Sequence, residues 1–549
     1  MLWWDRKARI AWELDELRRA GYEVDAPDIT DDIMTVGIIV DLDGDKHRLE
    51  ADFGELYPYF RADVRAPTLT FDHHQHPFSK NLCLVRRGTD TGDVEQSLAA
   101  LLKEQFPQIL ATGWAGDATS RGVETEQAEP VTAYFAPEAG SAIFFDGGWK
   151  LPDGFTTGRL TVVRDPESRK RPFRGVVAEV ATMANERVLS APPYLCHPGD
   201  RIEGYVVKLS APILEPDAAR LYAELKRTRL RGVHEGKTVV IAVVVPEEHA
   251  WRDASGEGWL FVVREGGNPC YFARPARVGE NDLRARTPEL HALDQKTVAV
   301  FGLGCIGAPS AIEFARSGAG AVRIADCDAV AAGTIVRWPL GLPTVGHAKT
   351  EVVAHFIRTN YPRTKVGRFG GRIGATAGEH AALFEMTEGA SLLYDASAEP
   401  DLSYFLADLA RNRGLPYVGV SGTQGGWGGV VVRLRADGTT GCWYCLQRAR
   451  DEGTIPAAPA AASSDVQPVG CMDPTFTGAS FDLATVALTG IRIAIATLLE
   501  GEGGYPAAPW DVLVIRLRDA SGQLLLPQFE GFTLPPYPDC PACNGSGSV

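Results

Sequence analysis

The pattern of hydrophobic and polar positions divides the chain into regions with different predicted secondary structure. Residues 1–118 begin with an amphipathic helix over 1–24 and end with a second helix over 93–110, whose apolar residues recur at helical spacing. Apolar runs at 35–42 and 66–71 predict strands between them, so we expect an α+β domain. Residues 119–280 contain several short β-like runs and predict a β-rich middle domain or connector; these runs are 159–164, 203–210, 237–246 and 258–264.

From residue 281 onward the pattern changes to alternating strands and helices. The near-continuous apolar run at 296–304 is typical of a buried parallel strand. Further runs follow at βαβ spacing, at 321–328, 391–397 and 415–422. Residues 281–549 are therefore expected to form a doubly wound, Rossmann-like domain, and the whole chain a multidomain α/β protein. An Ala-, Pro- and Ser-rich stretch at 451–470 predicts an exposed, mobile crossover.

Composition narrows the classes of protein that fit. A chain of 549 residues suits two to four domains. The formal net charge of −15 argues against nucleic-acid binding, which needs clustered Lys and Arg. No run approaches the roughly 18 apolar residues of a membrane span, and charges interrupt the N-terminal helix, so we expect no membrane segment, no signal peptide and a cytoplasmic location. The ten cysteines are then expected to be ligands, nucleophiles or buried residues, not disulfides.

A glycine-rich loop follows the strand at 296–304. Gly302, Gly304 and Gly307 have the G-x-G-x-x-G spacing and precede a predicted helix, whose first N–H groups can hold a phosphate. The next strand ends at Asp326, nineteen residues after Gly307, where a carboxylate can hold a ribose hydroxyl. These residues predict a nucleotide site, and an NAD-dependent dehydrogenase fits them as well.

The residues that follow favour one family. The segment from Asp326 to Lys349 resembles the adenylating (ThiF-type) domain of ubiquitin-activating enzymes and of their bacterial relatives in thiamine and molybdopterin biosynthesis. The matching positions are Asp326, Asp328, Val330, Arg337, Val345, Gly346 and Lys349. The resemblance implies ATP and Mg²⁺, with Asp326 and Asp328 in the nucleotide site and Arg337 and Lys349 on the phosphates. It also implies a homodimer and an arginine supplied from just before the domain, with Arg284 and Arg286 both as candidates.

The chain departs from the family pattern at several positions. Cys305 replaces a glycine and Thr334 replaces an asparagine. Asp395 matches the first acid of a D-x-x-D pattern that places magnesium, but Ala398 stands at the second, with Glu399 adjacent. The resemblance therefore assigns Mg²⁺ to Asp395 and leaves open what replaces the second acid.

Five cysteines in this domain predict further chemistry. Cys442, Cys445, Cys540 and Cys543 form two C-x-x-C pairs, which suit tetrahedral Zn²⁺ and would fix the C-terminal tail to the domain; the family has the same pairs. Cys471 follows the Ala/Pro-rich stretch and precedes a long apolar helix, and a thiol near a helix N-terminus ionises more readily. The resemblance implies that Cys471 accepts the activated carboxyl group as a thioester; the alternative is a buried structural cysteine.

The stretch HHQHPFSKNLCLV at 73–85 lies in the first region. Residues 1–118 resemble a ubiquitin-conjugating domain through Tyr57-Pro58, His76-Pro77 and Cys83-Leu84, in that order. The resemblance implies that Cys83 carries an acyl group. Phe78 stands where the family has an oxyanion-stabilising asparagine, and Asn81 is a candidate substitute.

A small metal site is the alternative for the same stretch. It would need His73, His74, His76 and Cys83 to converge. Because His73 and His74 would face opposite ways on a strand, at most two of the three histidines are expected to meet the cysteine.

Together these features predict a fused conjugating and activating enzyme, similar to those of bacterial anti-phage and ubiquitin-like operons. ATP would adenylate the C-terminal carboxylate of a ubiquitin-like or glycine-tailed carrier protein, Cys471 and then Cys83 would carry it, and an amine on a target protein would receive it. Two alternatives remain open. One is a sulfur-carrier adenylyltransferase, and the other is a degenerate nucleotide-binding scaffold, which the missing acid at Ala398 favours.

Overall fold

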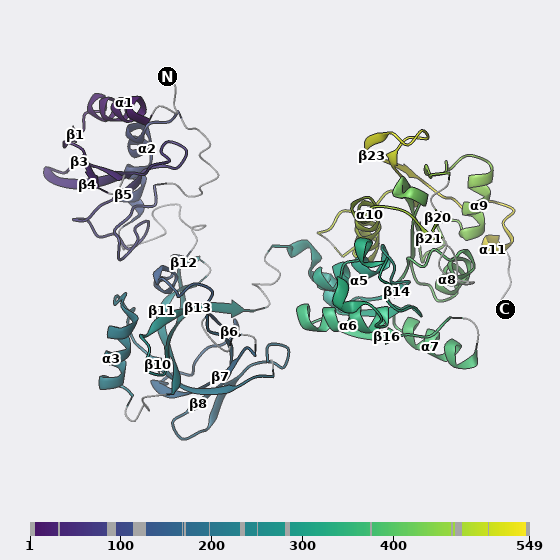
Figure 1. Cartoon of the computed structure of the whole chain (residues 1–549), viewed down its shortest axis with the longest axis horizontal. Helices are drawn as coiled ribbons and strands as arrows, with labels where there is room; N and C mark the ends of the chain where they lie inside the picture. Colours follow the sequence, from purple (N-terminus) through teal and green to yellow (C-terminus); the bar gives the residue numbers. More distant parts are fainter. Residues whose placement is uncertain are drawn as a thin grey trace. The chain divides into compact units, whose positions relative to one another are not determined.

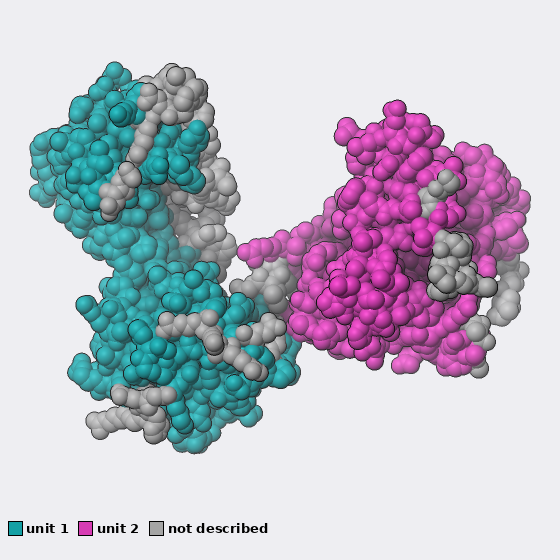
Figure 2. Space-filling view, in the orientation of Figure 1, with its two compact units in different colours: residues 1–280 teal, residues 281–549 magenta. Residues whose placement is uncertain are grey.

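The computed structural model describes most of the chain in two compact units, residues 1–280 and 281–549 (Figure 2). The described residues are 6–30, 33–84, 95–113, 128–166, 168, 172–196, 198–230, 237–249, 251–279, 286–373, 376–462, 465–466, 475–502 and 504–544. Each unit is described by itself below, with the element labels of Figure 1.

The first unit begins with an antiparallel sheet and two helices. Its elements are α1 (Arg6–Arg19), β1 (Glu23–Val24), β2 (Asp28–Thr30), β3 (Ile33–Leu42), β4 (Asp45–Phe53), β5 (Asp63–Arg65) and α2 (Leu98–Thr112). The strand order is β1-β3-β4-β5, and β2 also pairs with β3. Alternate residues of β3 are buried from Met34 to Val40, as the predicted strand at 35–42 requires.

A buried ion pair fixes α1 against the start of α2. Glu13 is fully buried, and its carboxylate accepts hydrogen bonds from Arg9 Nε at 3.0 Å and from the backbone N–H of Leu98 at 2.8 Å. The hydroxyl of Tyr57 donates to the same carboxylate. If α1 shifted along α2, the Glu13 carboxylate would lose a partner and its buried charge would be left unpaired, which is costly. The ion pair therefore favours the observed position of α1 beside the start of α2.

The strand predicted over 66–71 is wrong. Pro67 has no N–H to donate to a sheet, and β5 ends at Arg65. The backbone N–H of Ala66 donates to the Lys80 carbonyl, and that of Leu69 donates back to Ala66, so the chain turns here. Ala66, Leu69 and Phe71 are nevertheless buried, which accounts for the apolar pattern.

The rest of the first unit is a β-barrel. Its elements are η2 (Val131–Tyr134), β6 (Ala142–Asp146), β7 (Thr157–Arg164), β8 (Arg174–Thr182), β9 (Arg187–Ser190), β10 (Arg201–Lys208), α3 (Ala218–Thr228), β11 (Thr238–His249), β12 (Trp251–Glu265) and β13 (Tyr271–Val278). The order is β6-β13-β12-β11-β10-β7-β8-β9, and a further pairing of β6 with β8 closes the sheet. One face of β11 packs into the barrel core and the other against α3, which explains its uninterrupted apolar run.

The second unit is a twisted sheet with helices (Figure 1). Its strands are β14 (Thr297–Phe301), β15 (Ala321–Ala325), β16 (Lys365–Phe369), β17 (Leu392–Asp395), β18 (Tyr417–Gly422), β19 (Gly428–Leu434), β22 (Val512–Arg518) and β23 (Leu524–Phe532). The order is β16-β15-β14-β17-β18-β19-β22-β23. The first five are parallel and the last three antiparallel, so the expected doubly wound fold is present with an antiparallel extension.

The helices and the small ribbon of this unit complete the fold. They are η3 (Pro288–Gln295), α5 (Gly307–Arg316), η4 (Ile335–Arg337), η5 (Leu342–Thr344), α6 (Lys349–Asn360), α7 (Ala377–Thr387), α8 (Pro400–Asn412), η6 (Gln424–Gly426), α9 (Trp443–Asp451), β20 (Asp465–Val466), β21 (Thr475–Phe476), α10 (Ser480–Leu498) and α11 (Pro541–Asn544). Among the described helices α10 has the length and apolar character of a membrane span, but it packs on β18 and β19 as a core helix.

The Ala/Pro-rich stretch is attached to the sheet over its described part. Ile455 is 3% exposed, the backbone N–H of Ala461 donates to Gln424 at 3.0 Å, and Thr423 donates its hydroxyl to the carbonyl of Pro459. Most residues of 451–462 are exposed, as predicted, but Ile455 and these hydrogen bonds attach the stretch to the sheet, and its mobility stays a prediction.

Candidate functional site

The glycine loop lies at the switch point of the second unit's sheet. The chain leaves β14 toward β15 and β16 on one side and then returns to β17 and β18 on the other. Ligands of such folds bind outside the carboxyl ends of the strands at this point. Gly302 has φ of +82°, and a Cβ there would lie 2.6 Å from Ser397 Cα; a Cβ on Gly307 would lie 1.8 Å from the Gly302 carbonyl oxygen. Gly304 faces open space, which permits close approach of a ligand.

Asp326, Asp328 and Lys349 come together at the end of β15. Asp326 accepts the backbone N–H of Leu303 at 2.6 Å, so it holds the glycine loop directly. The Lys349 ammonium lies 2.7 Å from Asp328 Oδ2 and 3.6 Å from Asp326 Oδ1. The lysine side chain is only 11% exposed, and it begins α6. The loop thus has one nearly buried cation available for an anionic ligand.

Arg337 contacts described residues that follow Cys471 in the sequence. Its guanidinium donates to the hydroxyl of Thr475 at 2.6 Å and to the carbonyl of Phe476, four and five residues after that cysteine. Residues Thr475–Phe476 form β21, which pairs with β20 (Asp465–Val466), so the described residues on both sides of the segment form one ribbon. Cys471 itself lies outside the described residues, as does Arg284. Arg286 is described and exposed.

Asp395 is buried at the end of β17, where four donors surround it. Its carboxylate accepts the N–H and hydroxyl of Ser397 at 3.0 and 2.6 Å, the hydroxyl of Ser403 at 2.6 Å and that of Tyr417 at 2.8 Å. Ala398 has φ of +60°, in the left-handed region that non-glycine residues seldom adopt. A Mg²⁺ ion at Asp395 would displace one of these donors, and the assignment stays a prediction.

Cys305 fills a position in the loop where the family has glycine. Burial raises the pKa of its thiol, although the charge of Arg337 acts in the opposite direction. The side chain is partly buried and packs against the main core of the unit. Cys305 therefore acts as a small neutral residue in this loop.

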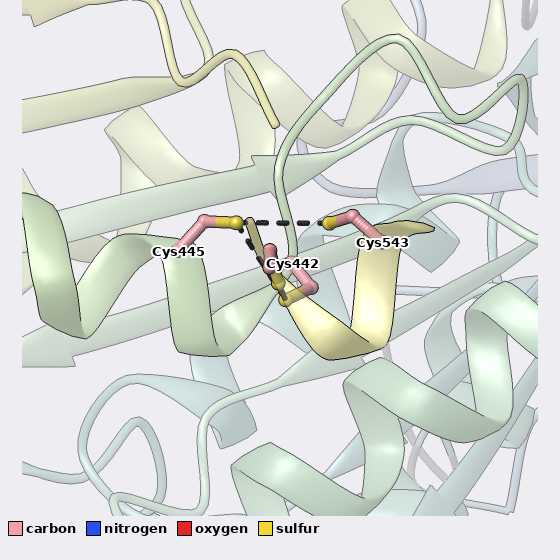
Figure 3. A group of neighbouring side chains, drawn as sticks. Cys442, Cys445 and Cys543 are labelled. Carbon is pink, nitrogen blue, oxygen red and sulfur yellow. Dashed lines mark hydrogen bonds between the residues drawn. The ribbon is translucent and has the colours of Figure 1, made fainter. Parts of the chain in front are cut away.

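The two C-x-x-C pairs meet, as predicted for a metal site. The sulfur atoms of Cys442 and Cys445 are 3.8 Å apart, those of Cys442 and Cys540 3.6 Å, and those of Cys445 and Cys543 3.6 Å (Figure 3). A tetrahedral Zn²⁺ with bonds of about 2.3 Å requires sulfur atoms about 3.8 Å apart. The four residues therefore fit zinc, and they connect the start of α9 to α11.

The stretch around Cys83 is a turn with a short bridge, not a strand. The backbone N–H of Cys83 donates to the His74 carbonyl at 2.8 Å, and Gln75 pairs with Leu82. His76 Nδ1 accepts the N–H groups of Phe78 and Ser79, so this ring stabilises its own turn. The Cys83 side chain is accessible to solvent, although neighbouring groups partly desolvate its thiol.

The expectation that His73 and His74 face opposite ways is wrong. His74 has φ of +63°, and both rings face acids of the middle region: His73 Nε2 lies 3.3 Å from Glu248 Oε1, and His74 Nδ1 lies 3.3 Å from Glu129 Oε1. Among the described residues, the four-cysteine group is the set that fits a metal ion, so the geometry gives no support to a histidine metal site.

Sequence reasoning missed a carboxylate, Glu129, whose charge acts on Cys83. Glu129 and Tyr134 lie in the middle region, and the Tyr134 hydroxyl donates to Glu129 Oε2 at 3.1 Å. Burial raises the pKa of the Cys83 thiol, and the negative charge of Glu129 raises it further. Glu129 lies 46 residues from Cys83, and no local motif marks it; only the fold places the two together.

Comparisons with known proteins identify the family. Residues 276–499 match the ThiF family. A protein of Sinorhizobium fredii, "Uncharacterized protein y4oA", is 30% identical over 544 residues, covering 91% of this chain and 90% of its own length. The SAMP-activating enzyme E1 of Haloferax volcanii is 30% identical over 182 residues, 32% of this chain and 64% of that enzyme. The solved structure of the microcin C7 biosynthetic enzyme MccB with N-formylated MccA has a TM-score of 0.36 at 17% identity, covering 46% and 69%.

The family match defines an adenylating enzyme of the ThiF type. The chain belongs to the ThiF family. Its match to the Sinorhizobium protein extends over nearly the whole chain, so the first unit is part of what the two proteins share.

Proposed function

We propose that the protein activates the C-terminal carboxylate of a ubiquitin-like or glycine-tailed carrier protein and transfers it, through Cys471 and Cys83, to an amine of a target protein. The carboxylate attacks the α-phosphorus of ATP, and pyrophosphate leaves. The Cys471 thiolate then attacks the carbonyl carbon of the acyl-adenylate, and AMP leaves. Exchange with the Cys83 thiolate moves the thioester, and an amine finally replaces the sulfur.

One observation carries the first half of the proposal. Arg337, predicted to contact phosphate, holds Thr475 and Phe476, which closely follow Cys471. The residue expected to bind the leaving group is therefore bonded to described residues that follow the candidate acceptor thiol by four and five positions. Because Cys471 precedes them so closely in the sequence, we infer that it can reach an acyl-adenylate formed at the glycine loop, which favours capture by proximity.

The roles of the other loop residues follow from their positions. Gly302, Gly304 and Gly307 would hold the nucleotide, Asp326 and Asp328 would orient it, and Lys349 would neutralise its phosphates. Mg²⁺ bound near Asp395 would add positive charge on the leaving pyrophosphate. Zn²⁺ on the four cysteines would be structural, because all four coordination positions are filled by protein. Arg284 or Arg286 would reach the nucleotide of a partner subunit in a homodimer.

Pyrophosphate exchange tests the activation step. We expect label from pyrophosphate to enter ATP when the enzyme is given a carrier candidate ending in glycine, and not when the same candidate lacks its last glycine. Failure of every glycine-ended protein encoded beside this chain to promote exchange would contradict the proposal and favour a nucleotide-binding scaffold.

Sulfur-carrier activation is the second candidate. "Adenylyltransferase and sulfurtransferase UBA4" of Kluyveromyces lactis is 25% identical over 259 residues, 47% of this chain and 52% of that protein. The two functions differ in product: conjugation gives a carrier–cysteine adduct that reducing agents remove, followed by an amide, whereas sulfur transfer gives a carrier thiocarboxylate. Mass spectrometry of the carrier after turnover separates them.

A further inference from the structure

His74 contacts both Cys83 and Glu129, and so joins the Cys83 loop to the middle region. Its backbone N–H donates to Glu129 Oε2 at 2.9 Å, and its ring lies 3.3 Å from Glu129 Oε1. Its carbonyl accepts the N–H of Cys83 at 2.8 Å. Because His74 has a left-handed backbone, which is unfavourable for a non-glycine residue, these contacts select one conformation. Glu129 is thereby held in a defined position relative to Cys83.

Further contacts hold the segment that contains Glu129 against the same loop. The rings of His76 and Tyr134 are 4.9 Å apart edge to face, and those of Phe78 and Phe135 are 5.1 Å apart. The N–H of Glu129 donates to Glu248 Oε2 at 3.1 Å. Phe78, found where the conjugating family has asparagine, thus contributes to an aromatic contact with the middle region.

The pKa values of Cys83 and Glu129 are shifted in opposite directions. Burial raises the pKa of Glu129, but hydrogen bonds from His74 and Tyr134 outweigh burial and bring the pKa below its ordinary value. The pKa of the Cys83 thiol is raised, first by burial and then by Glu129. At neutral pH Glu129 is therefore ionised, the form that can accept a proton, while a free Cys83 thiol is protonated, the form in which the sulfur leaves the reaction.

We propose that Glu129 carries the proton during acyl transfer from Cys83 to an amine. This inference rests on the proposed function, in which Cys83 holds an acyl group as a thioester. A neutral amine attacks the thioester carbon, the C–N bond forms, and the nitrogen becomes positively charged. Glu129 takes a proton from that nitrogen. The C–S bond then breaks with its electron pair on sulfur, and Glu129 returns the proton to sulfur, leaving an amide and the Cys83 thiol.

The other titratable groups on this loop are arranged differently. His73 pairs with Glu248, whose second oxygen accepts the N–H of Glu129. The Nδ1 atom of His76 accepts two backbone N–H groups of its own turn. Tyr134 donates to Glu129, and its own pKa is raised by burial and by that carboxylate. Of the groups around Cys83, Glu129 is the one whose negative charge acts on the thiol.

The inference gives the middle region a role in the reaction. A conjugating domain limited to residues 1–118 would lack Glu129 and Tyr134, which come from the residues that lead into the barrel. The barrel would then serve as the support that places a carboxylate at the carrier thiol.

A small-molecule assay on the full chain tests the inference without the natural carrier. The protein is loaded with the 2-mercaptoethanesulfonate thioester of N-acetyl-glycyl-glycine, and transfer from Cys83 to n-butylamine is followed by peptide mass spectrometry across pH. The exposed Cys196 serves as an internal reference thiol in the same chain. Iodoacetamide alkylation of Cys83 is measured in parallel over the same pH range.

We expect Glu129→Gln to slow transfer to butylamine about 100-fold. The same variant should alkylate faster, with its midpoint at lower pH, because the charge that raises the Cys83 pKa is gone. These opposite changes would not follow from general damage to the fold. Tyr134→Phe keeps the carboxylate and removes one hydrogen bond, so we expect transfer to slow about fivefold.

Glu265→Gln is the matched control. Glu265 lies in the same barrel, accepts a hydrogen bond from Tyr271 at 2.8 Å and pairs with Arg164 at 2.9 Å. The Glu265→Gln variant should lose stability to a similar extent as Glu129→Gln. It should leave the rates of transfer from Cys83 and of Cys83 alkylation unchanged. Equal transfer rates and equal alkylation midpoints in Glu129→Gln and wild type would overturn the inference while Cys83 remains a carrier. If wild-type Cys83 transfers no faster than Cys196, the conjugating step of the proposed function fails, and the inference falls with it.

Discussion

Lys349 is a nearly buried cation with two aspartates beside it, 2.7 and 3.6 Å away. Replacing it with glutamine removes the charge expected on the phosphates, and we expect pyrophosphate exchange to fall about 100-fold. Lys365→Gln, at an exposed lysine of β16, is the control and should keep normal exchange. A Lys349→Gln protein with wild-type exchange would contradict the assignment of this lysine to the phosphates.

Asp395 combines a structural role with the predicted metal role. In Asp395→Asn one acceptor oxygen becomes an NH₂ group facing a hydroxyl donor, so we expect the free energy of opening at the end of β17 to fall by about 2 kcal/mol. Hydrogen exchange of the β17 and β18 amides measures this locally, which suits a multidomain chain that does not unfold in two states. The Mg²⁺ concentration that gives half-maximal pyrophosphate exchange should also rise in this variant. If that concentration stays unchanged, Asp395 only holds the loop.

At the residue scale, the sequence predicts those site residues that lie close together along the chain. Glycine spacing and the acid at the end of the next strand point to Asp326 because strand, loop and helix are consecutive, and Leu303 does contact that acid. Glu129 could not be found this way, because its relation to Cys83 depends on the fold of the whole first unit. The donors around Asp395 were missed for a similar reason, since Ser403 and Tyr417 come from different elements.

The four cysteines connect the start of α9 to the short α11. We expect about one zinc per chain by elemental analysis. Cys540→Ser should lose that metal and lower the melting temperature of the second unit, because metal binding at such sites contributes directly to folding. Cys327→Ser, at an exposed cysteine outside the cluster, should retain the metal. A metal-free wild-type protein with an unchanged melting temperature would contradict the zinc site.

At the element scale, uninterrupted apolar runs were the reliable signal. The run at 237–246 lies in β11, which is buried on both faces, and the runs of the second unit lie in its parallel strands. The segment at 66–71 has the same apolar character but contains Pro67, and its side chains are buried from a turn. Hydrophobicity therefore predicted burial, and the backbone hydrogen bonds decided whether the segment was a strand.

At the scale of the whole molecule, the change of pattern near residue 280 coincides with the division into two compact units. Closure of the middle strands into a barrel was not predictable, because β6 must pair with β8 on one side and with the distant β13 on the other. The proposed order of acyl transfer likewise depends on the whole chain, since it would use one thiol from each unit.

The order of transfer can be tested with two variants of the full chain. With ATP and the carrier, Cys83→Ala should keep a reducing-agent-sensitive carrier adduct on Cys471 alone and lose conjugation. Cys471→Ala should show an adduct on neither residue, because Cys83 would receive the acyl group only from Cys471. Cys196→Ala, at an exposed cysteine outside both stretches, is the control and should form both adducts. Conjugation that persists in Cys83→Ala would contradict the carrier role of Cys83. An adduct on Cys83 in Cys471→Ala would mean that the acyl-adenylate reacts with Cys83 directly, and the relay would then have one thiol instead of two.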